Sequence, residues 1–241
     1  MARVFDLNLS GRVGNLIYYQ MNGKTYARRA PVYKNKPTER QKLMRENFGI
    51  VSKFGSRLLQ RMKGELFHPL ATQDYNKARG WMKAQFSEQK LAPEWKINSS
   101  KTSFCSLHGD IYIMNRVLVS ITFDQLADGR VLVQVPAFVP AQQIIAPPQA
   151  TNITMRMMLI SSAFTGLSPA LGFDSKEWSF PFQYVEQPAH EFTLSAGARP
   201  GEVMILVVAI RYTIVKKMQQ YTCQDSAYAL AAVLGMGRVS D

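Results

Sequence analysis

Apolar and polar positions alternate over two short runs within residues 14–31, GNLIYYQMNGKTYARRAP. Asn22-Gly23 separates the runs, and Asn-Gly between alternating segments is typical of a two-residue hairpin turn. Such a turn fixes the pairs across the hairpin, which are Met21 with Lys24, Tyr19 with Tyr26, and Ile17 with Arg28. An isolated hairpin is marginally stable in water, so we expect this one to lie on another surface.

Residues 37–100 show helical periodicity instead. Thr38 followed by Gln41 matches a capping box, and Gly64 is a plausible helix end. Apolar residues recur between them with helical spacing, at Leu43, Val51, Phe54, Leu58 and Met62. A close contact, a kink or a break is expected near Gly49 and Gly55, since glycine weakens a helix. A second helix is predicted over residues 73–86, burying Tyr75, Ala78, Met82 and Phe86.

From residue 101 onward the pattern becomes that of short strands separated by turns rich in proline and glycine. Residues 116–138 predict a hairpin around Asp128-Gly129, and apolar runs near residues 105, 155, 180, 193 and 210 predict further strands. About seven strands at this spacing favour an antiparallel sandwich. Residues 225–234 are predicted to form a short capping helix that ends at Gly235.

These patterns predict an α+β fold with three parts. A basic β-hairpin arm occupies residues 1–36, a helical segment occupies residues 37–100, and an antiparallel β-sandwich domain occupies residues 101–241. With 241 residues, 46% of them hydrophobic, the chain is long enough to bury a sizeable core.

Charge adds a second difference between the two ends of the chain. The formal net charge is +12, and the first 100 residues hold 19 of the 29 lysines and arginines but only 7 of the 17 acidic residues. Because such asymmetry concerns association rather than fold, it suggests an acidic or polyanionic partner at one end.

Catalytic and cofactor signatures are missing from the sequence. The three histidines, His68, His108 and His190, have no second ligand at metal-binding spacing and are interpreted as surface or turn residues. No nucleophile elbow or phosphate-binding loop occurs, and Cys105 and Cys223 are interpreted as buried reduced thiols. We therefore expect a non-enzymatic protein without a cofactor, a metal or a small-molecule substrate.

The N-terminus lacks the apolar core of a signal peptide, and the longest apolar run, residues 203–210, is too short to span a bilayer. The expectation is a cytoplasmic protein, or part of a particle assembled in the cytoplasm, without membrane contact.

Basic residues interleaved with tyrosines are the remaining chemical signal. Rings stack on bases and cations neutralise phosphates, but cross-strand tyrosines and edge cations also serve packing and subunit contacts. Both interpretations remain open. The candidate residues for contact with a partner or nucleic acid are Tyr19, Lys24, Tyr26, Arg28, Arg29, Lys34, Lys36, Lys53, Arg57 and Arg61.

The first 60 or so residues also contain a recognisable motif. LSGRVGN is followed by the aromatic hairpin with its central Gly23-Lys24, then by Arg28-Arg29 and KPTERQ at residues 36–41. This arrangement resembles an uncharacterised Bacteroidota family of unknown function, whose members open with an SGKVGN-type hairpin followed by a KPTE-x-Q helix start. Met21 stands where that family often has tryptophan. The resemblance implies a β-rich C-terminal half and supplies no activity.

Two functions follow as expectations. In the first, the chain is a self-associating, homo-oligomeric structural protein, such as one encoded by a phage or another mobile element, with the hairpin and helix making subunit contacts. In the second, it is a nucleic-acid-binding protein that uses its basic N-terminal region. The first requires apolar residues such as Leu16 and Ile17 to be exposed in the monomer.

Overall fold

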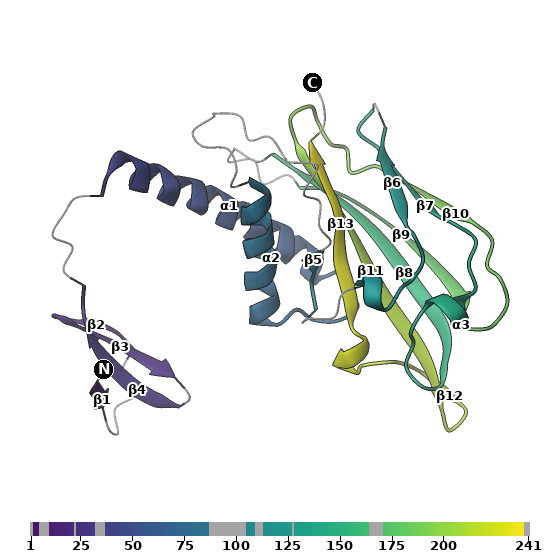
Figure 1. Cartoon of the computed structure of the whole chain (residues 1–241), viewed down its shortest axis with the longest axis horizontal. Helices are drawn as coiled ribbons and strands as arrows, with labels where there is room; N and C mark the ends of the chain where they lie inside the picture. The colour runs from purple at the N-terminus through teal and green to yellow at the C-terminus, as the bar shows by residue number, and fades with distance from the viewer. Residues whose placement is uncertain are drawn as a thin grey trace. The chain divides into compact units, whose positions relative to one another are not determined.

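Antiparallel sheets and helices make up a mixed α+β fold (Figure 1). The structure, a computed structural model, describes residues 2–4, 10–21, 23–31, 37–86, 105–108, 113–126, 128–163 and 171–238. Contacts divide the chain into two units, residues 1–44 and residues 45–241. The first unit holds the hairpin, and the second holds a six-stranded sheet, a three-stranded sheet and most of the helical segment.

The first unit contains a four-stranded antiparallel sheet. Its strands are β1 (Ala2–Val4), β2 (Gly11–Val13), β3 (Leu16–Met21) and β4 (Lys24–Arg29), in the order β1-β4-β3-β2. The register between β3 and β4 confirms the predicted hairpin, with Tyr19 opposite Tyr26 and Met21 opposite Lys24. Gly23 has a φ of 71°, which the turn requires and which glycine adopts without strain. Strands β1 and β2, which the sequence did not predict, widen the hairpin into a sheet.

The first helix, α1 (Glu39–Lys63), begins as its sequence predicts. The Thr38 amide donates to Gln41 Oε1 over 3.1 Å, and the Gln41 amide donates to Thr38 Oγ1 over 3.3 Å. This reciprocal pair is the predicted capping box. The second helix, α2 (Thr72–Phe86), also matches its prediction and buries Ala78 completely. The side chains of Met82 and Phe86 lie outside the described residues.

A six-stranded antiparallel sheet forms the centre of the second unit. Its strands are β5 (Cys105–Ser106), β8 (Ala150–Ser162), β9 (Gly172–Pro181), β11 (Val203–Lys216), β12 (Gln219–Thr222) and β13 (Leu230–Arg238). They follow the order β5-β13-β11-β8-β9, and β12 pairs with the end of β11.

A three-stranded antiparallel sheet accompanies it, in the order β10-β7-β6. Its strands are β6 (Thr122–Gln125), β7 (Val131–Val135) and β10 (His190–Leu194). The pairing of β6 with β7 confirms the hairpin predicted around Asp128-Gly129. The described residues of the unit also form the short helices η2 (Ile113–Asn115), α3 (Pro140–Gln143) and η3 (Ser226–Tyr228).

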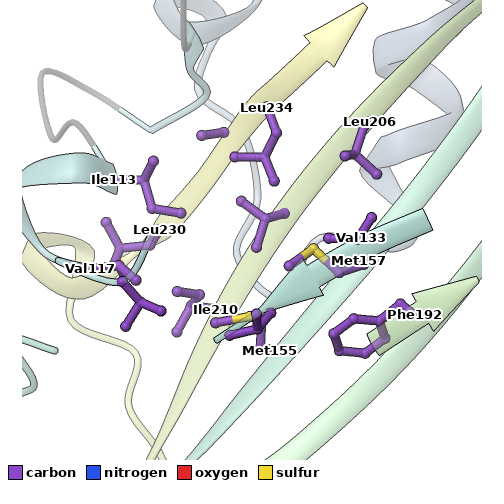
Figure 2. Packing of buried hydrophobic residues seen from close by; sticks show 14 of the residues in the cluster. Ile113, Val117, Val133, Met155, Met157, Phe192, Leu206, Ile210, Leu230 and Leu234 are labelled. Carbon is purple, nitrogen blue, oxygen red and sulfur yellow. The ribbon is translucent and has the colours of Figure 1, made fainter. Parts of the chain in front are cut away.

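Alternate residues of β11 explain why its sequence is apolar throughout. Leu206, Val208 and Ile210 belong to a buried cluster that includes Val133 and Phe192 from the three-stranded sheet. Figure 2 shows Leu206 and Ile210 in this cluster with Val133 and Phe192. The intervening residues of β11, from Val203 to Ala209, belong to a second buried cluster, shared with α1 and α2. A strand covered on both faces needs apolar residues at every position. The helical segment therefore shares its core with the large sheet.

The C-terminal prediction is wrong. Residues 225–234 do not form a capping helix; the structure has only η3 there, followed by β13. Strand β13 pairs with β11 and β5, and every residue from Leu230 to Met236 is buried. Alanine and leucine favour helix intrinsically, but burial between the two clusters decides the conformation at this position.

The end of α1 is fixed to the sheet by Arg156 of β8. Arg156 donates hydrogen bonds to the backbone carbonyl of Glu65 and to the Glu177 carboxylate on β9. Its guanidinium also lies 4.6 Å from the ring centroid of Phe67, and that of Arg211 lies 4.5 Å from the same ring. These contacts hold the turn after α1 against the sheet face.

Candidate interaction surfaces

One face of the hairpin sheet gathers four of the predicted contact residues. Tyr19 and Tyr26 stack, with 5.8 Å between ring centroids and 23° between planes. The Arg28 guanidinium lies 5.9 Å from the Tyr19 centroid, within cation–π range. Because residues directly opposite each other share a face, Lys24 lies on this face too, beside exposed Met21. We call this set, Tyr19, Lys24, Tyr26 and Arg28, the tyrosine face.

The other predicted residues of the arm do not join it. Arg29 is exposed but pairs with Leu16, on the opposite face of the sheet. That face also carries buried Thr25 and Ala27. Lys34 and Lys36 lie outside the described residues. Self-association requires Leu16 and Ile17 to be exposed in the monomer. Leu16 is 39% exposed, as required, whereas Ile17 is half-buried.

On α1, the three predicted cations differ in their surroundings. Lys53 and Arg57 are exposed, whereas Arg61 is half-buried. Arg61 donates to Glu65 over 3.1 Å, and its guanidinium lies 3.9 Å from the Phe173 ring centroid. Arg61 therefore contributes to packing α1 on the sheet.

The apolar stripe of α1 changes from exposed to buried along its length. Val51, Leu58 and Met62, which face the sheet, are no more than 4% exposed. Phe48, three residues before Val51 on the same stripe, is 55% exposed, and Met44 is 62% exposed. The sequence reasoning missed both residues, although their spacing of four residues from each other extends the stripe toward the helix N-terminus.

A second exposed apolar site lies in the loop after β9. Tyr184 is 78% exposed and Val185 is 57% exposed, and Glu186 beside them is also exposed. The apolar run near residue 180 predicts a strand, and the observed strand β9 ends at Pro181, before these residues. Pro181 and Pro188, which bracket the loop, were the signal that could have identified it.

Two of the three histidines are buried, which corrects their interpretation as surface or turn residues. His68 is 6% exposed, His108 is 7% exposed, and their rings meet edge to face at 6.0 Å. Burial lowers the pKa of both imidazoles below the ordinary value. The His68 charge lowers the pKa of His108 further, and the buried Asp74 carboxylate opposes these effects. Both histidines therefore favour the neutral form near neutral pH.

Among the described residues, no group of three or more histidine, cysteine, aspartate or glutamate side chains is arranged to hold a metal ion. Within the same ranges, no helix has both the length and the apolar content needed to cross a membrane. Cys223 is buried and free.

No protein-family model, no curated protein and no solved structure matches this chain. The candidate interaction surfaces of the chain are the tyrosine face, the exposed end of the α1 stripe and the loop after β9.

Proposed function

We propose that this chain is a non-enzymatic structural protein that associates with copies of itself, using the hairpin and α1 for subunit contacts. The observation that carries the proposal is the exposed end of the α1 stripe, where Met44 is 62% exposed while Val51 is 4% exposed. A helix stripe that is buried over only part of its length leaves an exposed apolar side chain such as Met44 accessible to another surface.

The hairpin sheet supports the same proposal. Val13, Leu16 and Met21 are exposed by 63%, 39% and 49%. Exposed apolar side chains on a small sheet suit docking to a neighbouring subunit. We further infer that the two sheets of the second unit form a β-sandwich body, since one buried cluster draws residues from both of them. A phage or another mobile element is the proposed source, because such elements encode self-assembling structural proteins.

A second candidate function is supported by the tyrosine face. Stacked rings beside an arginine and a lysine suit single-stranded nucleic acid, because bases stack on rings and cations bind phosphates. The test is a salt series of binding to a fluorescent oligonucleotide. Tyr19→Ala is the test variant and Tyr18→Ala, on the opposite face of the same strand, is the matched control. This function requires the first variant alone to weaken binding.

Light scattering of the purified full chain, at low and high salt and with and without nuclease, tests the primary proposal. Self-association predicts an oligomer that survives both nuclease and high salt. A monomer that sheds co-purified nucleic acid as salt rises would contradict self-association and favour the second candidate.

A further inference from the structure

Exposed apolar side chains of the second unit gather at one end of its large sheet. Beyond α1, the described residues of this unit expose six large apolar side chains, which are Leu118, Ile145, Tyr184, Val185, Met218 and Tyr221. Ile214, near the end of β11, lies opposite Ala150 at the start of β8. Asn152 of β8 lies in turn opposite Pro181, the last residue of β9. The turn between β11 and β12 and the loop after β9 therefore leave the sheet at the same end (Figure 1).

Hydrogen bonds hold the segment around α3 at this end too. The Tyr212 hydroxyl on β11 donates to the Ile145 carbonyl over 3.3 Å. The Leu118 amide donates to the last carbonyl of α3 over 2.8 Å, and the Ala141 amide donates to the Gln183 carbonyl over 3.2 Å. The six exposed apolar side chains are thus carried by segments that meet at one end of the sheet. We call this set the sheet-end surface.

The turn between β11 and β12 gives the sheet-end surface an apolar tip with positive charge. Lys216 pairs with Gln219, so Lys217 and Met218 are the two central residues of the turn. Their φ angles are 48° and 63°, in the left-handed region where Asn-Gly is favoured and larger side chains are strained. Met218 is 98% exposed, and both lysines are exposed. Backbone strain of this kind is typical of positions where the side chains serve a function.

The loop after β9 carries the opposite charge. Glu186 is exposed beside Tyr184 and Val185, and residues 182–189 contain no lysine or arginine. Two hydrogen bonds between Phe138 and Gln187, of 3.1 and 2.8 Å, anchor the loop. In the sheet, β11 and β8 lie between β12 and β9, which are therefore about 14 Å apart. The turn and the loop of one chain do not cover each other, and both stay accessible to a second copy.

We propose that two copies meet through their sheet-end surfaces about a two-fold axis, so that the β11–β12 turn of each docks on the loop after β9 of the other. Met218 then lies against Tyr184 and Val185, and Lys217 lies beside Glu186. This inference rests on the proposed self-association and adds a contact to those of the hairpin and α1.

Charge favours this crossed arrangement over the alternatives. A contact of turn with turn would bring two Lys217 side chains together, and a contact of loop with loop would bring two Glu186 side chains together. The crossed arrangement instead places opposite charges side by side, and the two-fold axis forms that contact twice. The result is a closed dimer rather than a growing chain.

The double variant Lys217→Asn/Met218→Gly tests the turn without disturbing the fold. Asn-Gly is the sequence that this turn favours, so thermal unfolding should show a stability no lower than that of the unchanged chain. Both tip side chains are lost, and the dissociation constant should rise about tenfold or more in sedimentation velocity of the nuclease-treated full chain. Lys176→Asn, which removes an exposed lysine from the middle of β9, is the matched control and should not change association.

A charge exchange tests the pairing of Lys217 with Glu186. Lys217→Glu and Glu186→Lys should each weaken association at low salt, because each places like charges together. An equimolar mixture of the two variants should associate again, since every turn then meets a loop of opposite charge. A mixture as weak as the separate variants would overturn this pairing.

Cross-linking locates the contact whatever the size of the oligomer. Under mild oxidation, an equimolar mixture of Met218→Cys and Val185→Cys should form a disulfide-linked dimer. Each variant alone, like the unchanged chain, should not, because residue 218 of one copy faces residue 185 of the other. A mixture without the cross-link, at concentrations where the chain associates, overturns the contact.

The remaining outcomes separate the two levels of the proposal. An unchanged chain that is monomeric at every concentration removes self-association and the sheet-end contact together. A chain that associates equally with and without the tip side chains overturns the contact alone. A monomer that binds vesicles of phosphatidylcholine and phosphatidylserine, and loses this binding in Lys217→Asn/Met218→Gly, would show that the surface meets a membrane instead.

Discussion

Phe48 and Val51 lie three residues apart on the same stripe of α1, and 55% of Phe48 is exposed whereas only 4% of Val51 is. Helical spacing places both residues toward one side of α1, so the difference comes from what lies against the helix. The sheet covers the stripe from Val51 onward. More than half of the Phe48 side chain is therefore accessible in the monomer, in the part of α1 that we propose makes subunit contacts.

Phe48→Ala and Phe54→Ala form a matched pair on one helix. Phe48 is exposed, so its truncation should change the free energy of unfolding by no more than about 0.5 kcal/mol. Phe54 is 4% exposed in the core, and its truncation should cost about 3–5 kcal/mol. Urea unfolding measures both. If α1 makes subunit contacts, Phe48→Ala should weaken the oligomer without the loss of stability expected for Phe54→Ala. Equal destabilisation by the two variants would contradict the exposed position of Phe48.

The buried histidine pair predicts a dependence of stability on pH. Burial lowers the pKa of His68 and His108 in the folded chain, so the unfolded chain binds these protons at higher pH. Their stabilising contribution is complete above about pH 6.5, the ordinary pKa of histidine, and declines as pH falls from there toward the lowered folded values. The urea concentration at the unfolding midpoint should therefore decrease as the pH is lowered from 7.5 to 5.5, the range in which histidine titrates.

The double variant His68→Asn/His108→Asn tests this prediction, and His190→Asn is its control. The double variant should flatten the pH dependence, whereas His190→Asn should retain it. His190 stacks on Trp178 at 4.5 Å and is only half-buried. An unchanged slope in the double variant would mean that other groups cause the dependence.

Gly235 marks a close approach between the two sheets of the second unit. A Cβ atom added there would lie 2.2 Å from Cζ of Phe123 on β6, which is closer than any real contact. Gly235→Ala should therefore cost about 1–3 kcal/mol of the free energy of unfolding by overpacking. Gly237→Ala is the control on the same strand, because its Cβ would meet only the Gln125 side-chain oxygen at 3.0 Å. Equal thermal stability of the two variants would argue against close packing of β6 on β13.

Arg156 should matter for stability more than other paired arginines. It is 19% exposed, and Arg156→Met would leave the Glu65 carbonyl and the Glu177 carboxylate without this donor. We expect a loss of about 1–3 kcal/mol, in line with the removal of one partner from hydrogen bonds to a charged group. Arg130→Met is the control, since Arg130 pairs with Asp128 at the surface and such pairs contribute about 1 kcal/mol or less. A similar unfolding midpoint for the two variants would contradict the role given to Arg156.

Local signals in the sequence predicted local structure well. Asn22-Gly23 determined the hairpin register, Thr38 and Gln41 determined the start of α1, and Asp128-Gly129 determined the hairpin of β6 and β7. In each case the residues that form the contact are neighbours in sequence. Long-range packing decided the rest: β13 is a strand because it is buried between two apolar clusters, although its composition suits a helix.

The candidate surfaces were only partly predictable for the same reason. Pairing across one hairpin placed Tyr19, Lys24, Tyr26 and Arg28 on one face, as expected from alternation. Arg61 looked like part of a basic stripe, but its contact with Phe173 depends on a strand far away in sequence. The exposure of Phe48 likewise depends on where the sheet ends beneath α1, which helical periodicity does not reveal.

Sedimentation velocity of the nuclease-treated full chain over a wide dilution series decides whether the chain associates with copies of itself. Self-association requires a weight-average sedimentation coefficient that rises with protein concentration, at low salt and at high salt alike, and that Phe48→Ala lowers. A single species of monomer mass at every concentration and salt would contradict it.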